Sequence, residues 1–344
     1  MTTDTEFEPS NDDLDLEGPE RRNLSFSPEL PTLQTSWDQT SLGELKLCPQ
    51  KYKYSIIDGY EPRETNVHFI FGGEYHHAFE LYDHLKAEGL DYKSAVEKTV
   101  TDTLMRTWRK DLNRPWPSDN PVKNRGTLIR SIIWYLDQFK DDPLETVILH
   151  DGKPAVELSF RIELGCQSAL TGEPFLLCGH IDKLVKFEGQ NAIVDKKTTK
   201  FSINQSFFAR FSPDNQVSAY MLAGGIILDE PVTTMIIDAA QILVNSTKFQ
   251  RGIIHRTPEQ LHEWLRDTWI WISHAETYAK NNYWPRNDKA CGQPHQDPKT
   301  GEIKYGCPYR EVCAADISMR QILLDNNYNR RVWDPIQPRT LERA

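Results

Sequence analysis

Two apolar segments near the middle of the chain each contain ionisable residues at positions where a buried strand would point its side chains inward. The first, residues 176–182, ends in Gly-His-Ile-Asp, and the second, residues 191–198, contains Ile-Val-Asp-Lys-Lys-Thr. Between them, a short polar break contains Gly189, which is typical of a tight β-hairpin turn. The pattern predicts an antiparallel pair of strands, residues 176–187 and 191–198, joined by a two-residue loop at Gly189 and Gln190.

This hairpin would place three charged side chains together. With that loop, Asp182 lies opposite Lys197, and Asp195 lies diagonal to Asp182 on the same face, because strand side chains alternate between faces. Two carboxylates and an ammonium group suit a divalent cation and a positioned water molecule. The alternative is a solvated strand face with a salt bridge. The flanking apolar residues favour burial, and buried charges need a partner or a metal ion.

A predicted helix over residues 66–87 precedes the hairpin. It contains Gly72, His76 and Glu80, and His76 and Glu80 are four positions apart and so share one helix face. Taken alone, His76 is explained equally well as a core or surface histidine.

A second helix, predicted over residues 213–222, follows the hairpin. It places Gln216 and Tyr220 on one face, again four positions apart. Taken alone, these two would be a surface glutamine and a core tyrosine.

These four motifs together resemble the PD-(D/E)XK nucleases, and specifically their RecB-like exonuclease branch. The G-x-x-x-H-x-x-x-E helix, the G-x-x-D strand, the (D/E)-x-K strand and the Q-x-x-x-Y helix occur in the family's order across residues 36–315. The resemblance implies an α/β fold with a restriction-endonuclease-like core, in which helices flank a central mixed sheet. It also implies hydrolysis of DNA phosphodiester bonds with the help of Mg²⁺ or Mn²⁺.

The same resemblance assigns roles to individual residues. The metal ligands would be His76, Asp182, Asp195 and the backbone carbonyl of Lys196, and a nitrogen ligand favours Mn²⁺. The lysine would hold or help to deprotonate the attacking water, and the Q-x-x-x-Y pair would orient that lysine or contact DNA. The catalytic set is therefore Asp182, Asp195, Lys197, Gln216 and Tyr220.

Four of the six cysteines are arranged in a second pattern, with Cys48 near the start and Cys291, Cys307 and Cys313 near the end. In a reducing compartment such a set favours a metal centre over disulfides, with zinc or an iron–sulfur cluster as alternatives. The resemblance to AddB and to CRISPR-associated exonucleases implies a 4Fe–4S cluster. This chain departs from them in the fifteen residues between Cys291 and Cys307, which leaves His295 as a substitute for Cys291.

Composition divides the chain further. Residues 1–20 contain eight acidic residues and no basic one, so this segment carries most of the net charge of −10. We expect a disordered acidic tail (1–32), a nuclease domain (33–315) with a helical insertion (93–141), and a C-terminal tail (316–344). The Cys-cluster subdomain (48 and 291–313) would join the N- and C-terminal segments. No segment approaches the roughly 20 apolar residues of a membrane span, and a cytoplasmic protein is expected.

Two features keep alternatives open. The insertion mixes basic and aromatic residues, which suits binding of single-stranded DNA but equally suits amphipathic helices with solvated arginines and buried tryptophans. Glu157, in a predicted strand over residues 155–164, is either a further carboxylate of the site or a surface residue. The mixed basic and aromatic set is Arg106, Trp108, Arg109, Lys110, Arg114, Trp116, Lys123, Arg125 and Arg130.

The sequence therefore predicts a metal-dependent DNA nuclease, an exonuclease acting in DNA recombination, repair or phage and CRISPR DNA processing. Its expected partners are DNA, including single-stranded ends, and a helicase or another recombination or processing protein. Two alternatives remain: a catalytically silent DNA-end-binding or adaptor module stabilised by a Cys-ligated metal, and a structure-specific endonuclease. No P-loop is present, so the chain itself is not expected to be an NTP-driven motor.

Overall fold

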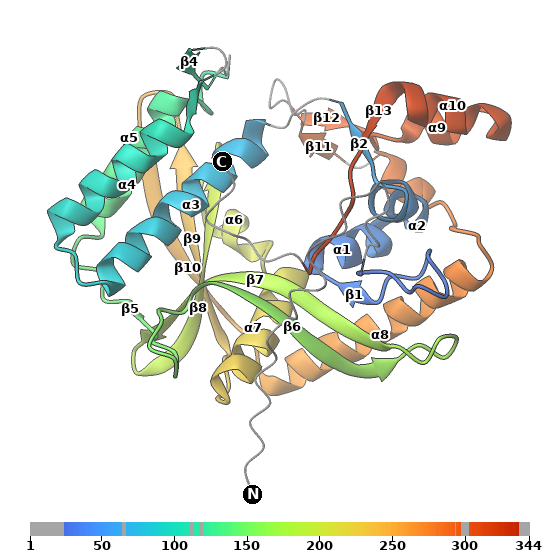
Figure 1. Ribbon diagram of the computed structural model, residues 1–344, viewed down its shortest axis with the longest axis horizontal. Coiled ribbons are helices and arrows are strands. Elements are labelled where there is room, and N and C mark those ends of the chain that lie inside the picture. Colours follow the sequence, from blue (N-terminus) through green and yellow to red (C-terminus); the bar gives the residue numbers. More distant parts are fainter. Residues whose placement is uncertain are drawn as a thin grey trace, which may run out of the picture.

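A mixed seven-stranded sheet forms the centre of the computed structural model, which describes residues 24–63, 67–110, 113–116, 120–292, 294–296 and 303–336 (Figure 1). The strands run in the order β1-β7-β8-β9-β10, and β5 and β6 also pair with β7. Pairing is parallel for β1–β7 and β8–β9 and antiparallel elsewhere. The strands are β1 Ser36–Trp37, β5 Glu145–Thr146, β6 Val156–Gln167, β7 Pro174–Phe187, β8 Gln190–Thr199, β9 Thr234–Ile242 and β10 Thr247–His255.

Helices cover both faces of this sheet, as the expected restriction-endonuclease-like core requires (Figure 1). Aromatic and aliphatic side chains of α3 and α5 pack on one face of β9. Side chains of α1, α7 and α8 belong to a larger core cluster with residues of β7 and β8 and of the other face of β9. Within the described part of the chain, no helix has both the length and the apolar character needed to span a bilayer. The main helices are α1 Gln39–Leu47, α3 Val67–Ala87, α4 Tyr92–Arg106, α5 Arg125–Gln138, α7 Asn215–Leu228 and α8 Pro258–Lys280.

The β7–β8 turn differs from the predicted one. Phe187 pairs with Gln190, so the loop is Glu188-Gly189 and not Gly189-Gln190. Both loop residues have positive φ, +50° and +78°, which is the requirement of a type I′ turn and matches the right-handed twist of the strands. The register consequently shifts by two residues. Asp182 lies beside Asp195 and not opposite Lys197, and the even shift leaves every side chain on its predicted face.

The insertion and the chain ends also differ from expectation. The insertion contains α4 and α5 joined through a small hairpin of β3 (Trp108–Arg109) and β4 (Arg114–Pro115). Ser25 and Ser27 are buried, so the folded part begins before residue 33; residues 1–23 of the predicted tail lie outside the described residues.

Of the predicted C-terminal tail, the structure describes residues 316–336, and most of these are folded. It contains α10 (Ile317–Asn327) and β13 (Tyr328–Arg330), and β13 pairs with β2 (Tyr60–Pro62). Strand β10 was not predicted either. It pairs with β9 along its whole length and forms the last strand of the sheet. The remaining short elements are α2 Pro49–Tyr52, a π-helical turn Lys53–Ile57, α6 Gln205–Ala209, a 3-10 turn Asp288–Gly292, β11 Pro294–Gln296, β12 Ile303–Tyr305 and α9 Arg310–Ala314.

Gly179 is the position in β7 where the core tolerates no side chain. A Cβ atom there would lie 2.7 Å from the Phe160 ring and 3.2 Å from the Tyr220 ring. Those two rings pack edge to face, with centroids 5.9 Å apart. The glycine of the G-x-x-D motif thus permits a close aromatic contact three residues before Asp182.

We predict that Gly179→Ala lowers the free energy of unfolding by about 1–3 kcal/mol, because the added methyl group overpacks a closed core. Urea unfolding followed by tryptophan fluorescence measures the change. Gly43→Ala in α1 is the matched control, since nothing lies within 4 Å of its Cβ position, and alanine there should be neutral or stabilising. Equal effects at the two glycines would contradict the packing argument.

Candidate active site

Two buried carboxylates from neighbouring strands form the centre of the site. Asp182 on β7 is 8% exposed and Asp195 on β8 is 1% exposed. The backbone N–H of Lys196 donates to Oδ2 of Asp182 at 2.9 Å. The strand pairing itself therefore fixes the position of the Asp182 carboxylate.

Lys197 and Gln216 border Asp195. Nζ of Lys197 lies 2.6 Å from Oδ2 of Asp195 and donates to Oε1 of Gln216 at 2.9 Å. The Gln216 amide in turn donates to Oδ1 of Asp195 at 3.3 Å. Gln216, one residue into α7, thus holds both the ammonium and the carboxylate in place.

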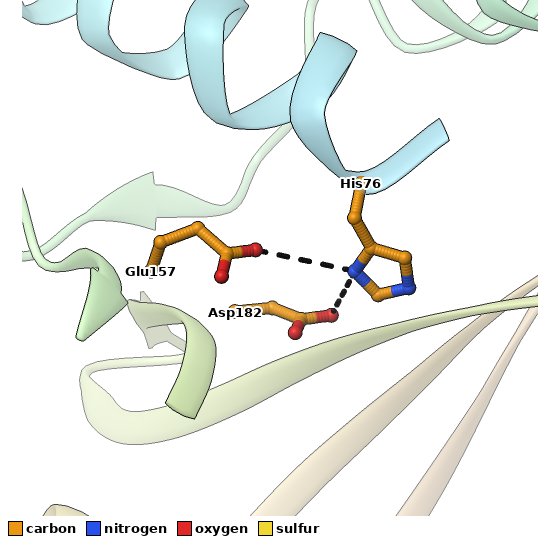
Figure 2. Close-up of side chains that lie close together, drawn as sticks. All are labelled: His76, Glu157 and Asp182. Atoms are coloured by element: carbon orange, nitrogen blue, oxygen red, sulfur yellow. Dashed lines mark ion pairs between the residues drawn. The ribbon is translucent and has the colours of Figure 1, made fainter. Parts of the chain in front are cut away.

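His76 and Glu157 complete the group on the side of Asp182 (Figure 2). Nδ1 of His76, from α3, lies 3.1 Å from Oδ2 of Asp182 and 4.0 Å from Oε1 of Glu157. Ligand atoms of these three residues lie within 4.8 Å of one another, close enough to surround one cation. Glu80, from the same helix, lines the small pocket beside them.

Glu157 is a site residue that sequence reasoning left open. It stands between Val156 and Leu158, which pair with Lys183 and Ile181, so it faces Asp182 across the ladder. Its φ is +47°, a left-handed conformation that costs energy for a residue other than glycine and that concentrates at functional sites. The sequence feature that could have identified Glu157 as a site residue is its position as an acidic residue between two apolar residues of a strand.

Tyr220 lies in the core between β7 and α7. Its side chain is 2% exposed, packs against Phe160, and its hydroxyl accepts a hydrogen bond from Gln39 at 3.1 Å. Of the predicted Q-x-x-x-Y pair, Gln216 reaches the charged residues, whereas Tyr220 lies in the core beneath the β7 glycine.

Comparison with known sequences agrees with this geometry. A sequence model of the PD-(D/E)XK nuclease superfamily matches residues 36–314, which is most of the chain. The chain belongs to the PD-(D/E)XK nuclease superfamily. Membership implies a nuclease, which hydrolyses phosphodiester bonds, and members use divalent metal ions. No curated protein matches the chain.

Two solved structures are distantly similar to this PD-(D/E)XK protein. One is a "Putative exonuclease" from Eubacterium rectale, at 12% identity and a TM-score of 0.44, covering 87% of this chain and 100% of the other. The second, named SSO0001, has 12% identity and a TM-score of 0.25, covering 42% of this chain and 60% of the other. At such scores neither likeness bears on function.

The two carboxylates of this PD-(D/E)XK site titrate in opposite directions. Burial raises the pKa of Asp182, but the adjacent His76 outweighs burial and holds that pKa well below its ordinary value. Burial raises the pKa of Asp195 from 3.8 to about 6, and the charge of Asp182 adds to this although Lys197 opposes it. Burial lowers the pKa of Lys197, but Asp195 and Asp182 raise it overall. Without a cation, Asp182 is therefore readily ionised, whereas ionisation of Asp195 is unfavourable.

Lys196, between the two site residues of β8, extends toward a different set of partners. Its Nζ donates to the Tyr135 hydroxyl at 2.8 Å and lies 3.2 Å from Oδ2 of Asp238, its neighbour on β9. Nε of Arg251 on β10 lies 3.4 Å from the same carboxylate, and Arg251 also pairs with Asp142. Each charge in this row has an opposite partner, as burial requires. The row holds β8, β9 and β10 together immediately behind the site.

The four predicted ligand cysteines border one small pocket. Cys48 directly follows α1, Cys291 lies in the 3-10 turn, Cys307 precedes α9, and Cys313 lies within α9. Burial raises the pKa of Cys313 to about 11, and the neighbouring thiols, Cys307 first, add to this. The side chain of His295 lies outside what the structure describes. Cys166 and Cys178 lie in β6 and β7, away from this pocket.

We predict that Asp195→Asn stabilises the metal-free protein by up to about 3 kcal/mol at pH 7, since one pKa unit corresponds to about 1.4 kcal/mol. The raised pKa means that the folded state binds the Asp195 proton more tightly than the unfolded state. The gain of the variant over the wild type should therefore appear as the pH rises from 3.8 to about 6 and then level off.

Asp182→Asn is the matched control, because the pKa of Asp182 is shifted downward. This variant should be less stable than the wild type at pH 7, and the difference should vanish as the pH falls through the lowered pKa. Urea unfolding of EDTA-treated protein measures both variants, from pH 7 down to 3.8 for Asp195→Asn and further down, below 3.8, for Asp182→Asn. Changes of the same sign would contradict the charge arrangement described above.

Proposed function

We propose that the chain is a Mg²⁺- or Mn²⁺-dependent deoxyribonuclease that acts as an exonuclease on DNA ends, in recombination, repair or phage and CRISPR DNA processing. The observation that carries the proposal is the convergence of Asp182, Asp195 and Lys197 on one face of the β7–β8 hairpin. In hydrolysis of a phosphodiester, negative charge develops on the phosphate oxygens, and such a site can offset it.

The residues present fit a divalent cation. Carboxylate oxygens suit Mg²⁺ and Mn²⁺, and an imidazole nitrogen moves the preference toward Mn²⁺. His76 and Asp182, whose ligand atoms lie with one of Glu157 within 4.8 Å of one another, would hold the ion. Asp195 and the Lys196 carbonyl would complete the ligand set. The raised pKa of Asp195 supports this assignment, because a buried carboxylate that resists ionisation gains from a nearby cation. When bound, the metal ion would polarise the phosphate and favour formation of hydroxide from water.

The other side chains would position the reacting groups. Lys197, held by Asp195 and Gln216, points its ammonium group into the site. There it can hold the attacking water and neutralise charge that develops on the phosphate. Gln216 acts through these contacts and is a positioning residue. Tyr220 would act only indirectly, through the packing of β7 against α7.

We predict that Asp195→Ala reduces cleavage of end-labelled DNA by several orders of magnitude while the protein stays folded. The loss follows from removing a carboxylate that would hold the cation and that pairs with Lys197. The assay compares single- and double-stranded substrates with Mg²⁺, Mn²⁺ or EDTA, and circular dichroism checks the fold.

Asp151→Ala is the matched control for this assay, since the Asp151 side chain is exposed and pairs with Lys153 and with no residue of the site. It should cleave like the wild type. Full activity of Asp195→Ala would remove the proposed mechanism. Release of internal fragments before mononucleotides would argue for an endonuclease in place of an exonuclease.

We also propose that Cys48, Cys291, Cys307 and Cys313 bind a 4Fe–4S cluster that joins the two ends of the domain. Three basic side chains, those of Lys51, Arg286 and Arg310, line the same pocket and would balance an anionic Cys₄ centre. The pocket connects segments more than two hundred residues apart, so ligation would convert binding free energy into folding free energy.

We predict that anaerobically purified protein contains iron and acid-labile sulfide and absorbs near 400 nm, as cysteine-ligated iron–sulfur centres do. Cys307→Ser should lose the absorbance and unfold at a lower temperature, because the ends would no longer be tied. Cys166→Ser, in β6, is the matched control and should keep both. Colourless protein with one equivalent of zinc would contradict the cluster.

A further inference from the structure

A groove lies on the helical insertion, away from the residues described so far. It lies between the end of α4, the segment after β4 and the start of α5, and encloses about 700 Å³. Figure 1 shows β4 projecting beyond these two helices at the outer end of the insertion. The residues that matter here are Leu104, Trp116, Arg125, Ile129, Ile133 and Trp134.

Helix α5 carries two apolar faces, and only one is buried. Leu128, Ile132 and Leu136 pack into the core with α3 and β9. Ile133 and Trp134, on the groove side, are 40% and 42% exposed. A helix that is apolar on both sides normally has a second contact surface, and no described element of this chain covers it.

The groove is basic as well as apolar. The Arg125 guanidinium lies 5.6 Å from the Trp108 ring, and that of Arg130 lies 5.3 Å from the Trp134 ring. Arg125 donates to Thr107 and to the Leu104 carbonyl, and Arg130 donates to carbonyls of the β9–β10 loop. All of these acceptors are hydroxyl or carbonyl oxygens, and none of the described residues that line the groove is acidic.

We propose that this groove binds single-stranded nucleic acid, with bases stacked on Trp116 and Trp134 and phosphates near Arg125 and Arg130. Aromatic rings accept any base on their faces, and guanidinium groups hydrogen-bonded to neutral oxygens attract a polyanion. An apolar lining also suits a protein partner, but the positive charge in a chain of net charge −10 favours nucleic acid. The proposal rests on the proposed function only in taking DNA as the ligand.

The end of α4, which borders the groove, also contacts α3, the helix that carries His76. Arg106, at the end of α4, donates two hydrogen bonds to the carboxylate of Glu74, at 3.0 and 3.2 Å. Glu74 lies on α3 two residues before His76. One helix, with a diameter of about 10–12 Å with its side chains, therefore separates the groove from His76. A strand bound in the groove would approach or leave the site by crossing α3.

Fluorescence anisotropy of the full chain in EDTA tests the proposal, with labelled oligothymidylate and a labelled hairpin duplex as probes. Trp134→Ala should weaken binding of oligothymidylate about five-fold or more, which is the effect of losing one stacked base, and should leave duplex binding unchanged. Trp134→Phe should restore most of the affinity. Tyr283→Ala is the control, because Tyr283 is 70% exposed and lies outside the groove.

Several outcomes would overturn the proposal. These are equal binding by Trp134→Ala and Tyr283→Ala, an equal loss for single strand and duplex, or a wild-type dimer that Trp134→Ala dissociates without altering oligonucleotide binding. Trp116→Ala repeats the test if Trp134→Ala fails a circular dichroism check. Cleavage with Mn²⁺ is measured separately. If the wild type does not cleave DNA but its oligonucleotide binding depends on Trp134, only the nuclease proposal is refuted. If the wild type cleaves DNA and the tryptophan variants bind oligonucleotide as the wild type does, only the groove proposal is refuted.

Discussion

The antiparallel pairing of β7 with β8 determines where the candidate catalytic groups lie. The type I′ turn at Glu188 and Gly189 sets that register, and the register brings Asp182 beside Asp195. The ladder also supplies the Lys196 N–H that holds the Asp182 carboxylate. Because neighbouring side chains alternate between faces, slipping by one residue would send Asp195 and Lys197 to the other side of the sheet. The chemistry of the site therefore depends on a two-residue loop some distance away.

The buried carboxylates of the site repel one another, and paired charges on the neighbouring strands stabilise the fold around them. Two buried acids stand side by side, and Glu157 adds a third carboxylate in a left-handed backbone conformation. Behind them, Lys196 and Asp238 are part of a row of buried charges in which every member has an opposite partner. That row ties three strands together, so the scaffold can hold a destabilised site in place. Such a division is expected where activity and stability compete.

The sequence predicted the core of the fold and most of the charged group, but not every contact. Asp182, Asp195 and Lys197 fall on one face because strand alternation survives a two-residue error in the loop. The place of Tyr220 depends on the missing side chain of Gly179, a contact between distant segments that no local pattern reveals. Strand β13 pairs with β2, a segment more than two hundred residues earlier, so no local pattern distinguishes it from a tail. A helicase partner and a cytoplasmic location stay predictions.

The union of the two chain ends has a consequence for how the protein is made. Strand β2 and Cys48 leave the ribosome more than two hundred residues before β13 and the remaining three pocket cysteines. The hydrogen-bonding edge of β2 and the thiol of Cys48 therefore stay unpaired until the intervening segment has been translated. Contacts so far apart in sequence form slowly, and a waiting strand edge is open to wrong pairing. The pairing of β2 with β13 is thus expected to be a late step in the folding of this domain.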